Sequence, residues 1–212
     1  MPFSPTCCMA GKAMTTAPLK MVLVGGLPGS GKTYFGARIA GRVGVFVDKD
    51  VVSHGFTEAL LKKFGQPPSD RESPEYLEKV RPLEYQAIRA VAIKNLEVGH
   101  SVVCSAPYIK EFHDNAWVYH SRIDAERHGA ECFFVWMNAD EEMLHTRIRN
   151  RNAHRDTWKL QHWETWYASA PKEPPLNISD LIVMDNTSGA HSDMQQQIVD
   201  FLLRIQSRGA YG

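Results

Sequence analysis

The chain has 212 residues, 43% of them hydrophobic and 23% charged, which is enough for one domain with a substantial core. Lys plus Arg and Asp plus Glu both number 24, so the formal net charge is zero. Proteins that bind long nucleic acids usually carry a basic excess, so such a partner is disfavoured without being excluded. No run of about eighteen apolar residues occurs, and we therefore expect no membrane span.

The first segment, residues 1–19, is rich in Ser, Thr, Pro and small residues and lacks the long apolar centre of a signal peptide. We predict a flexible tail there and a single domain over residues 20–212. The cysteines are spaced poorly for a disulfide framework, which favours a reducing, cytoplasmic location. They are Cys7, Cys8, Cys104 and Cys132.

A glycine-rich loop separates the predicted strand Met21–Val24 from a helical stretch, Tyr34–Val43. Glycines let successive backbone N–H groups point at a phosphate, and the helix N-terminus adds the positive end of its dipole. The motif G-x-x-x-x-G-K-[ST] assigns Lys32 to the β- and γ-phosphates and the Thr33 hydroxyl to Mg²⁺. The alternative, a glycine-rich turn that binds nothing, is disfavoured by the flanking strand and helix. The predicted nucleotide-binding residues are Gly26, Leu27, Pro28, Gly29, Ser30, Gly31, Lys32, Thr33 and Tyr34.

The second predicted strand, Val45–Val47, runs directly into Asp48-Lys49-Asp50. In a doubly wound sheet the carboxyl ends of the strands line the ligand crevice. A carboxylate there can deprotonate an acceptor hydroxyl or hold the metal, and phosphoryl transfer needs both actions. We predict that Asp50 is the base, that Asp48 helps to hold Mg²⁺ through water, and that both line the acceptor site. For Asp50 alone, a helix N-cap is the alternative interpretation.

Three further strands and several crossover helices complete the expected fold. Nearly continuous apolar runs are typical of parallel strands that are covered on both faces. A long helix is predicted over residues 74–98, where Pro82 implies a kink or two shorter helices. The last helix is predicted over residues 193–208. We therefore predict an α/β fold with a doubly wound parallel sheet, whose remaining strands are Ser101–Cys104, Glu131–Met137 and Leu181–Met184.

Four arginines lie within nine residues after the fourth predicted strand. Arg147 and Arg151 are four residues apart, so they face one way on a helix. Arginine neutralises a transferring phosphoryl group through forked hydrogen bonds. We predict a lid over about residues 145–170, in which Arg147 and Arg151 bind the nucleotide and act in catalysis while Arg155 contacts the acceptor. The alternative is a solvated helix face paired with acidic neighbours.

The segment from Trp158 to Tyr167 is unusually aromatic. If it forms one helix, Trp158 and Trp166 share a face and Trp163 lies on the next, so Trp158 and Trp163 are candidate substrate-binding residues. Ordinary packing of a lid helix is the alternative and is somewhat favoured. Asn186, after the last strand, is a weak candidate for nucleotide binding and is equally well explained by a turn.

Together these segments resemble the P-loop kinase branch that includes polynucleotide kinases, zeta toxins, chloramphenicol phosphotransferases and gluconate-kinase-like enzymes. The likeness covers roughly residues 20–203 and is carried by Gly26–Thr33, by Asp48-Lys49-Asp50 and by Arg147, Arg151 and Arg155-Asp156. It is greatest for bacterial ATP-binding proteins of the AAA type. The resemblance implies a nucleoside-kinase-like three-layer sandwich, ATP and Mg²⁺ as cofactors, and Asp50 as the residue that activates an acceptor hydroxyl.

Two positions depart from the pattern of these families. Polynucleotide kinases carry an arginine three residues after the acidic residue, where this chain has Ser53, and relatives often carry an aspartate where it has Ser105. The sequence therefore predicts an ATP-dependent kinase acting on a hydroxyl of a small molecule such as a sugar, a nucleoside or an antibiotic-like compound. The alternatives are a kinase of polynucleotide 5′-hydroxyls or nucleotide-sugars, as in toxins, and a non-catalytic ATP-binding regulatory protein.

Overall fold

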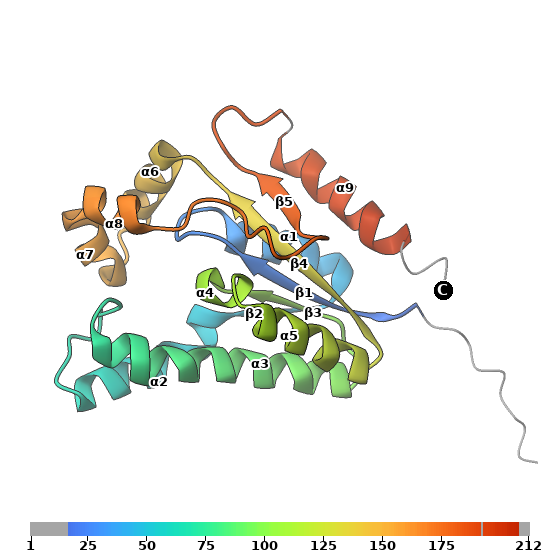
Figure 1. The fold of residues 1–212 in the computed structure, drawn as a ribbon, viewed down its shortest axis with the longest axis horizontal. Coiled ribbons are helices and arrows are strands. Elements are labelled where there is room, and N and C mark those ends of the chain that lie inside the picture. The colour runs from blue at the N-terminus through green and yellow to red at the C-terminus, as the bar shows by residue number, and fades with distance from the viewer. Residues whose placement is uncertain (1–16, 192, 208–212) are drawn as a thin grey trace, which may run out of the picture.

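A parallel five-stranded sheet organises the protein (Figure 1). The computed structural model describes residues 17–191 and 193–207, so most of the predicted tail lies outside the described residues. The strand order is β2-β3-β1-β4-β5, and every paired neighbour is parallel. This is the predicted doubly wound sheet. Its strands are β1 (Leu19–Gly25), β2 (Val45–Asp48), β3 (Val102–Ser105), β4 (Ala130–Asn138) and β5 (Ile182–Asp185).

Helices cover both faces of the sheet, which explains why the strands are nearly continuous in apolar residues. One hydrophobic core lies between the sheet and helices α3 and α5, and a second lies between the sheet and helices α1 and α9 (Figure 1). The helices are α1 (Lys32–Val43), α2 (Lys49–Lys63), η1 (Glu75–Val80), α3 (Arg81–Glu97), α4 (Ile109–Phe112), α5 (Asn115–Arg127), α6 (Glu141–Arg151), η2 (His154–Asp156), α7 (Thr157–Gln161), α8 (Trp163–Ser169) and α9 (Met194–Ser207). None of the helices in the described part of the chain has the length and apolar character to cross a membrane.

The long helix predicted over residues 74–98 is two helices in succession. The π-helical turn η1 passes directly into α3, and Pro82 lies in the first turn of α3. A proline is tolerated there because the first N–H groups of a helix have no partner within that helix. The wider π-helical turn therefore accommodates the proline without a loop between the two segments.

The aromatic segment also forms two helices rather than one. The backbone of His162, with φ −124° and ψ 39°, leaves the helical region and separates α7 from α8. The prediction of a single continuous helix there was wrong. Together with α6 and η2, the two short helices form a lid at one end of the molecule, beside the carboxyl ends of the strands (Figure 1).

The carboxyl ends of three neighbouring strands meet at one place. Asp48 at the end of β2 is paired in register with Ser105 of β3, and Ser105 is paired with Val24 of β1. The glycine-rich loop begins at Gly26, directly after β1. The sheet order therefore brings this loop, the acidic turn after β2 and Ser105 to the same edge.

Candidate active site

The loop Gly26–Thr33 has the backbone geometry of an anion cradle. Gly26, Gly29 and Gly31 adopt φ values of 134°, 85° and 98°, which strain any residue with a side chain. A Cβ on Gly26 would lie 2.6 Å from the carbonyl oxygen of Met137. Helix α1 begins at Lys32 without a side-chain cap, so its first N–H groups are free to face an anion.

Lys32 lies within this cradle and is only 9% exposed. Its ammonium donates to the carbonyl oxygen of Leu27 at 2.7 Å. Burial lowers the pKa of Lys32 to about 7; the charge of Asp50 opposes this effect, and Arg151 adds to it. A negatively charged ligand in the cradle would stabilise the protonated lysine.

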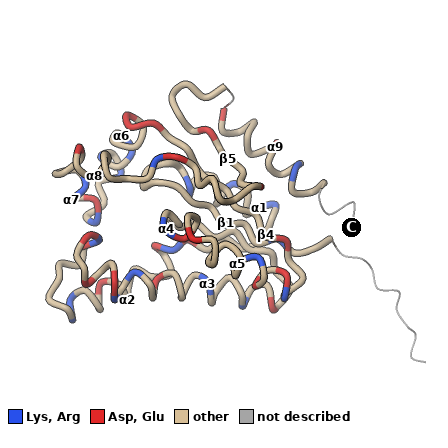
Figure 2. Tube along the Cα trace, in the orientation of Figure 1, with Lys and Arg blue, Asp and Glu red and all other residues tan. Residues whose placement is uncertain are grey.

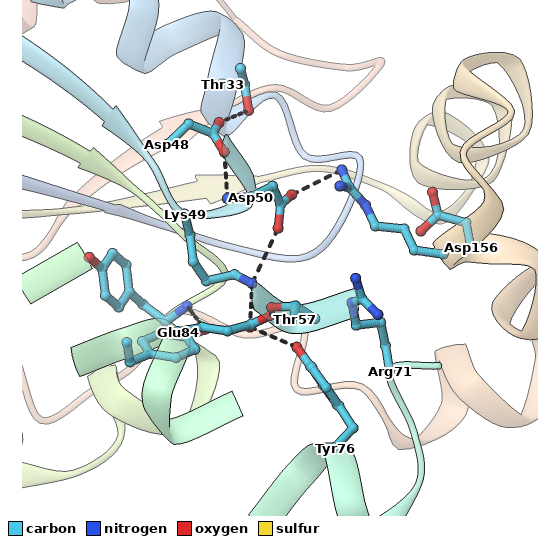
Figure 3. A network of polar contacts seen from close by, with 12 residues as sticks. Thr33, Asp48, Lys49, Asp50, Thr57, Arg71, Tyr76, Glu84 and Asp156 are labelled. Carbon is cyan, nitrogen blue, oxygen red and sulfur yellow. Dashed lines mark hydrogen bonds and ion pairs between the residues drawn. The ribbon is translucent and has the colours of Figure 1, made fainter. Parts of the chain in front are cut away.

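Asp48 connects the acidic turn to the loop. It caps α2, since its Oδ1 accepts a hydrogen bond from the N–H of Asp50 at 2.9 Å, while its Oδ2 accepts one from the Thr33 hydroxyl at 3.0 Å (Figure 3). The N-cap that we considered for Asp50 is therefore formed by Asp48. A hydroxyl and a carboxylate side by side suit Mg²⁺, which is commonly held by one or two carboxylates together with substrate phosphates and water. Thr33 and Asp48 have the chemistry to hold this ion, which stays a prediction.

Asp50 lies between two cations. Its carboxylate is 3.2 Å from the Lys49 ammonium and 2.9 Å from the guanidinium of Arg155 in the lid. Burial acts to raise the pKa of Asp50, but the charges of Lys49 and Arg155 outweigh it and hold this pKa below its ordinary value. In this arrangement Asp50 is ionised and its two oxygens are directed by the protein.

A buried network that the sequence did not reveal anchors this side of the site. Lys49 is 4% exposed and Glu84 is 1% exposed, and their charged groups are 2.6 Å apart. Glu84 also accepts hydrogen bonds from the Thr57 hydroxyl at 2.7 Å and from the Tyr76 hydroxyl at 2.9 Å (Figure 3). Lys49 therefore joins Asp50 to a fully bonded carboxylate in the interior. The one signal in the sequence was a glutamate at a core-facing position of the long predicted helix.

The three lid arginines selected from the sequence share no partner with one another. Arg147 donates to the carbonyl oxygen of Gly29 at 3.4 Å and to Asn186 at 3.3 Å. Arg151 forms a two-bond pair with Asp156 at 2.6 and 2.7 Å. Helix α6 ends at Arg151, so Arg155 follows a turn and is free to reach Asp50. Of these three arginines, Arg151 and Arg155 line the cleft, whereas Arg147 lies against the loop.

The other predicted site residues are divided between the cleft and its surroundings. Tyr34 lines the cleft, and Asn186 donates to the carbonyl oxygen of Ser30 at 2.8 Å, which supports the loop from behind. Trp158 stacks on His162, and Trp163 stacks on Tyr167 and donates to Glu141. The lining of the cleft includes neither Trp158 nor Trp163 but does include Trp166, which sequence reasoning did not select.

These elements enclose a cleft of about 400 Å³. One wall is the phosphate loop, another is the turn after β2, a third is the loop before η1 together with η1 itself, and the lid forms the fourth. Ser105 also lines it and is 3% exposed. The lining residues discussed below are Lys32, Thr33, Asp48, Lys49, Asp50, Arg71, Tyr76, Arg81, Arg151, Arg155, Lys159 and Trp166.

Comparison with known proteins identifies the family. The AAA_33 family, described as an AAA domain, matches residues 21–173. The chain belongs to this AAA domain family. The match begins at β1 of the AAA domain and ends after the lid, so it includes every wall of the cleft. Comparison with curated proteins gave no match.

Solved structures similar to this AAA domain share its fold. A gluconokinase from Sinorhizobium meliloti is 20% identical with a TM-score of 0.52, over 91% of this chain and 93% of that one. The APS kinase of Mycobacterium tuberculosis, in complex with AMPPNP and APS, is 21% identical with a TM-score of 0.53, over 89% and 99%. A sugar kinase from Janibacter is 18% identical with a TM-score of 0.56, over 90% and 95%. The fold of the AAA domain is thus that of P-loop kinases.

Proposed function

We propose that the protein is an ATP-dependent kinase that transfers the γ-phosphoryl group to a hydroxyl of a small molecule. The observation that carries the proposal is the presence of two carboxylates with different surroundings in one cleft beside the phosphate loop. Asp48 contacts Thr33 of the loop, whereas Asp50 contacts Arg155 of the lid. Such a division suits a metal-holding and an acceptor-orienting carboxylate.

The residues take roles that follow from their contacts. The loop N–H groups and Lys32 bind the triphosphate, and Arg151 and Arg155 face the same cleft and neutralise developing charge. The oxygen of the acceptor hydroxyl bonds to the γ-phosphorus, and Asp50 accepts the proton of that hydroxyl. The bond between the γ-phosphorus and the β,γ-bridging oxygen breaks, and ADP leaves. Mg²⁺, held between Thr33 and Asp48, would supply charge neutralisation for the phosphates.

The size and charge of the site favour a small acceptor. The cleft of about 400 Å³ must accommodate both the transferring phosphate and the acceptor. Acidic and basic residues are interspersed over the trace and do not gather by sign into one broad region of the view drawn (Figure 2). An extended polynucleotide is bound mainly through a stripe of positive charge. The solved structures of similar fold include proteins described as gluconokinase, APS kinase and sugar kinase.

A metabolite screen with three matched proteins tests the proposal. The wild type should add one phosphate group to a small molecule in a cell extract supplied with ATP, as measured by mass spectrometry. Lys32→Ala should weaken ATP binding and abolish formation of the product. Asp50→Asn should bind ATP nearly as well as the wild type while forming product on the order of 10²-fold more slowly, or slower still.

Three outcomes would contradict this assignment, each in a different way. ATP binding with slow ATP loss and no phosphorylated product would favour a regulatory ATP-binding protein. Phosphate transfer to an oligonucleotide 5′ end, with binding that falls steeply between about 50 and 200 mM salt, would favour the polynucleotide alternative. A larger loss in Asp48→Asn than in Asp50→Asn, at unchanged ATP affinity, would exchange the roles of the two aspartates.

A further inference from the structure

Most of the positive charge in the cleft is already paired with acidic side chains. Seven cationic side chains line it, and within the described residues five of them form an ion pair with a carboxylate. The two without such a pair, within the ranges 17–191 and 193–207, are Lys32 and Arg71. Lys32 belongs to the phosphate loop. The proposed function gives Arg71 no role. The paired cations are Lys49 with Asp50 and Glu84, Arg81 with Glu111, Arg151 with Asp156, Arg155 with Asp50, and Lys159 with Glu72.

The backbone around Arg71 holds its guanidinium in place. Nη1 donates to the carbonyl oxygens of Pro68 at 3.0 Å and Asp70 at 2.5 Å. The guanidinium also stacks over the Tyr76 ring, 5.3 Å from its centroid. No acceptor among the described residues bonds Nε or Nη2. One edge of the arginine is therefore fixed while the other edge keeps its donors free.

The neighbouring carboxylates cannot satisfy this free edge, because both are engaged elsewhere. Asp70 accepts from the N–H groups of Glu72 and Ser73, both at 3.0 Å, and from the Ser73 hydroxyl. The charge of Arg71 helps to lower the pKa of Asp70, but the two side chains do not form an ion pair. Glu72 is paired with Lys159 of the lid at 2.6 Å. The loop thus fixes the position of Arg71, while the carboxylates of Asp70 and Glu72 bond to other partners.

The buried network described above links Arg71 to Asp50. Arg71 stacks on Tyr76, whose hydroxyl bonds Glu84, and Glu84 holds Lys49, which contacts Asp50. Figure 3 shows the Arg71 guanidinium pointing toward the space between Asp50 and the lid residue Asp156. The free donors and the acceptor-orienting carboxylate are therefore held in a fixed relation on the same side of the cleft.

We propose that Arg71 binds an anionic group of the acceptor, a carboxylate, sulfate or phosphate, while the acceptor hydroxyl lies at Asp50. The inference rests on the proposed function and narrows its substrate class to hydroxyl compounds that carry a negative charge. Nε and Nη2 form a fork that matches two oxygens of one anion. A free, immobilised guanidinium in a cleft gains most from such a partner, since charge-assisted hydrogen bonds are the strong ones.

The experiment measures anion binding to the protein with its phosphate loop already occupied. Wild type saturated with Mg²⁺ and a non-hydrolysable ATP analogue is titrated with inorganic phosphate, sulfate and acetate by calorimetry. We expect one of these anions to bind at a single site, and its identity distinguishes a phosphate or sulfate group on the acceptor from a carboxylate. Arg71→Gln should weaken that binding about tenfold or more, because two charge-assisted bonds are lost. Arg127→Gln, an exposed change on α5, should leave it unchanged.

The outcomes separate this inference from the proposed function. If the loaded wild type binds none of the three anions, or if Arg71→Gln binds them as the wild type does, Arg71 has only a structural role in its loop and the inference is overturned. Failure of the wild type to bind the ATP analogue would overturn the proposed function and the inference with it. Arg71→Lys keeps the charge but loses the fork, so we expect it to fold and to show intermediate binding. This variant decides the question if Arg71→Gln proves unstable.

Discussion

Glu84→Gln tests the buried network through the stability of the protein. The substitution keeps the shape of the side chain and an acceptor for Thr57 or Tyr76, but it removes the carboxylate 2.6 Å from the Lys49 ammonium and leaves only the longer contact with Asp50 at 3.2 Å. Both groups are less than 5% exposed, so water cannot replace the lost partner. Removing one member of a buried ion pair typically costs about 3–5 kcal/mol.

That loss should be visible in both thermal and urea unfolding. In a domain of this size, about 1 kcal/mol corresponds to roughly 2–4 °C, so we expect the Tm of Glu84→Gln to fall by roughly 6–20 °C. Glu78→Gln, an exposed change on η1, is the matched control and should stay within about 0.5 kcal/mol of the wild type.

A double variant separates a lost pair from a poorly packed side chain. Lys49→Met combined with Glu84→Gln removes both charges, and its destabilisation should be smaller than the sum of the two single variants. The reasoning is refuted if Glu84→Gln unfolds at the same urea concentration as the wild type, or if the two single effects add without any coupling.

Two further predictions concern the nucleotide side of the cleft. Burial lowers the pKa of Lys32 to about 7, and bound phosphates favour its charged form, so nucleotide binding should take up a proton. Affinity for a Mg²⁺–ATP analogue, measured by calorimetry, should therefore fall as pH rises above about 7, approaching tenfold per pH unit. Lys32→Met should abolish this slope, and a flat wild-type profile from about pH 6 to 9 would show that the lysine does not gain a proton on binding. Once an acceptor is known, Arg151→Ala should lower kcat about 10³-fold with little change in the KM for ATP. Arg155→Ala should act similarly and without additivity, because both arginines face the same cleft. A raised KM at unchanged kcat in steady-state kinetics would instead mean that the arginines bind only the ground state.

The parts of the fold that local sequence determines could be predicted. All five strands were found within about two residues of their ends, because buried parallel strands are short apolar runs bounded by glycine or polar residues. The phosphate loop followed from a motif whose glycines have the positive φ values that it requires. The first aspartate of the acidic turn lies where the strand end predicts it, beside Thr33.

The remaining features depend on contacts between distant segments. The ion pair between Lys49 and Glu84 joins residues 35 positions apart, and a glutamate at a core-facing position of its helix does not say which cation it meets. The contact of Arg155 with Asp50 depends on where α6 ends, which is set by Asn152 in a left-handed conformation with φ 47°. The break at His162 likewise comes from packing, since no proline or glycine marks it.

The turn after β2 has a consequence for changes in chain length. Asp48, Lys49 and Asp50 are consecutive, yet they face the loop hydroxyl, the interior and the cleft in turn. One inserted or deleted residue would rotate the following side chains of α2 by about 100° about its axis. Lys49 would then leave Glu84, and Asp50 would leave the cleft at the same time. A substitution here removes the contacts of one side chain, whereas a change in length would disrupt the metal-binding, structural and acceptor-binding contacts together.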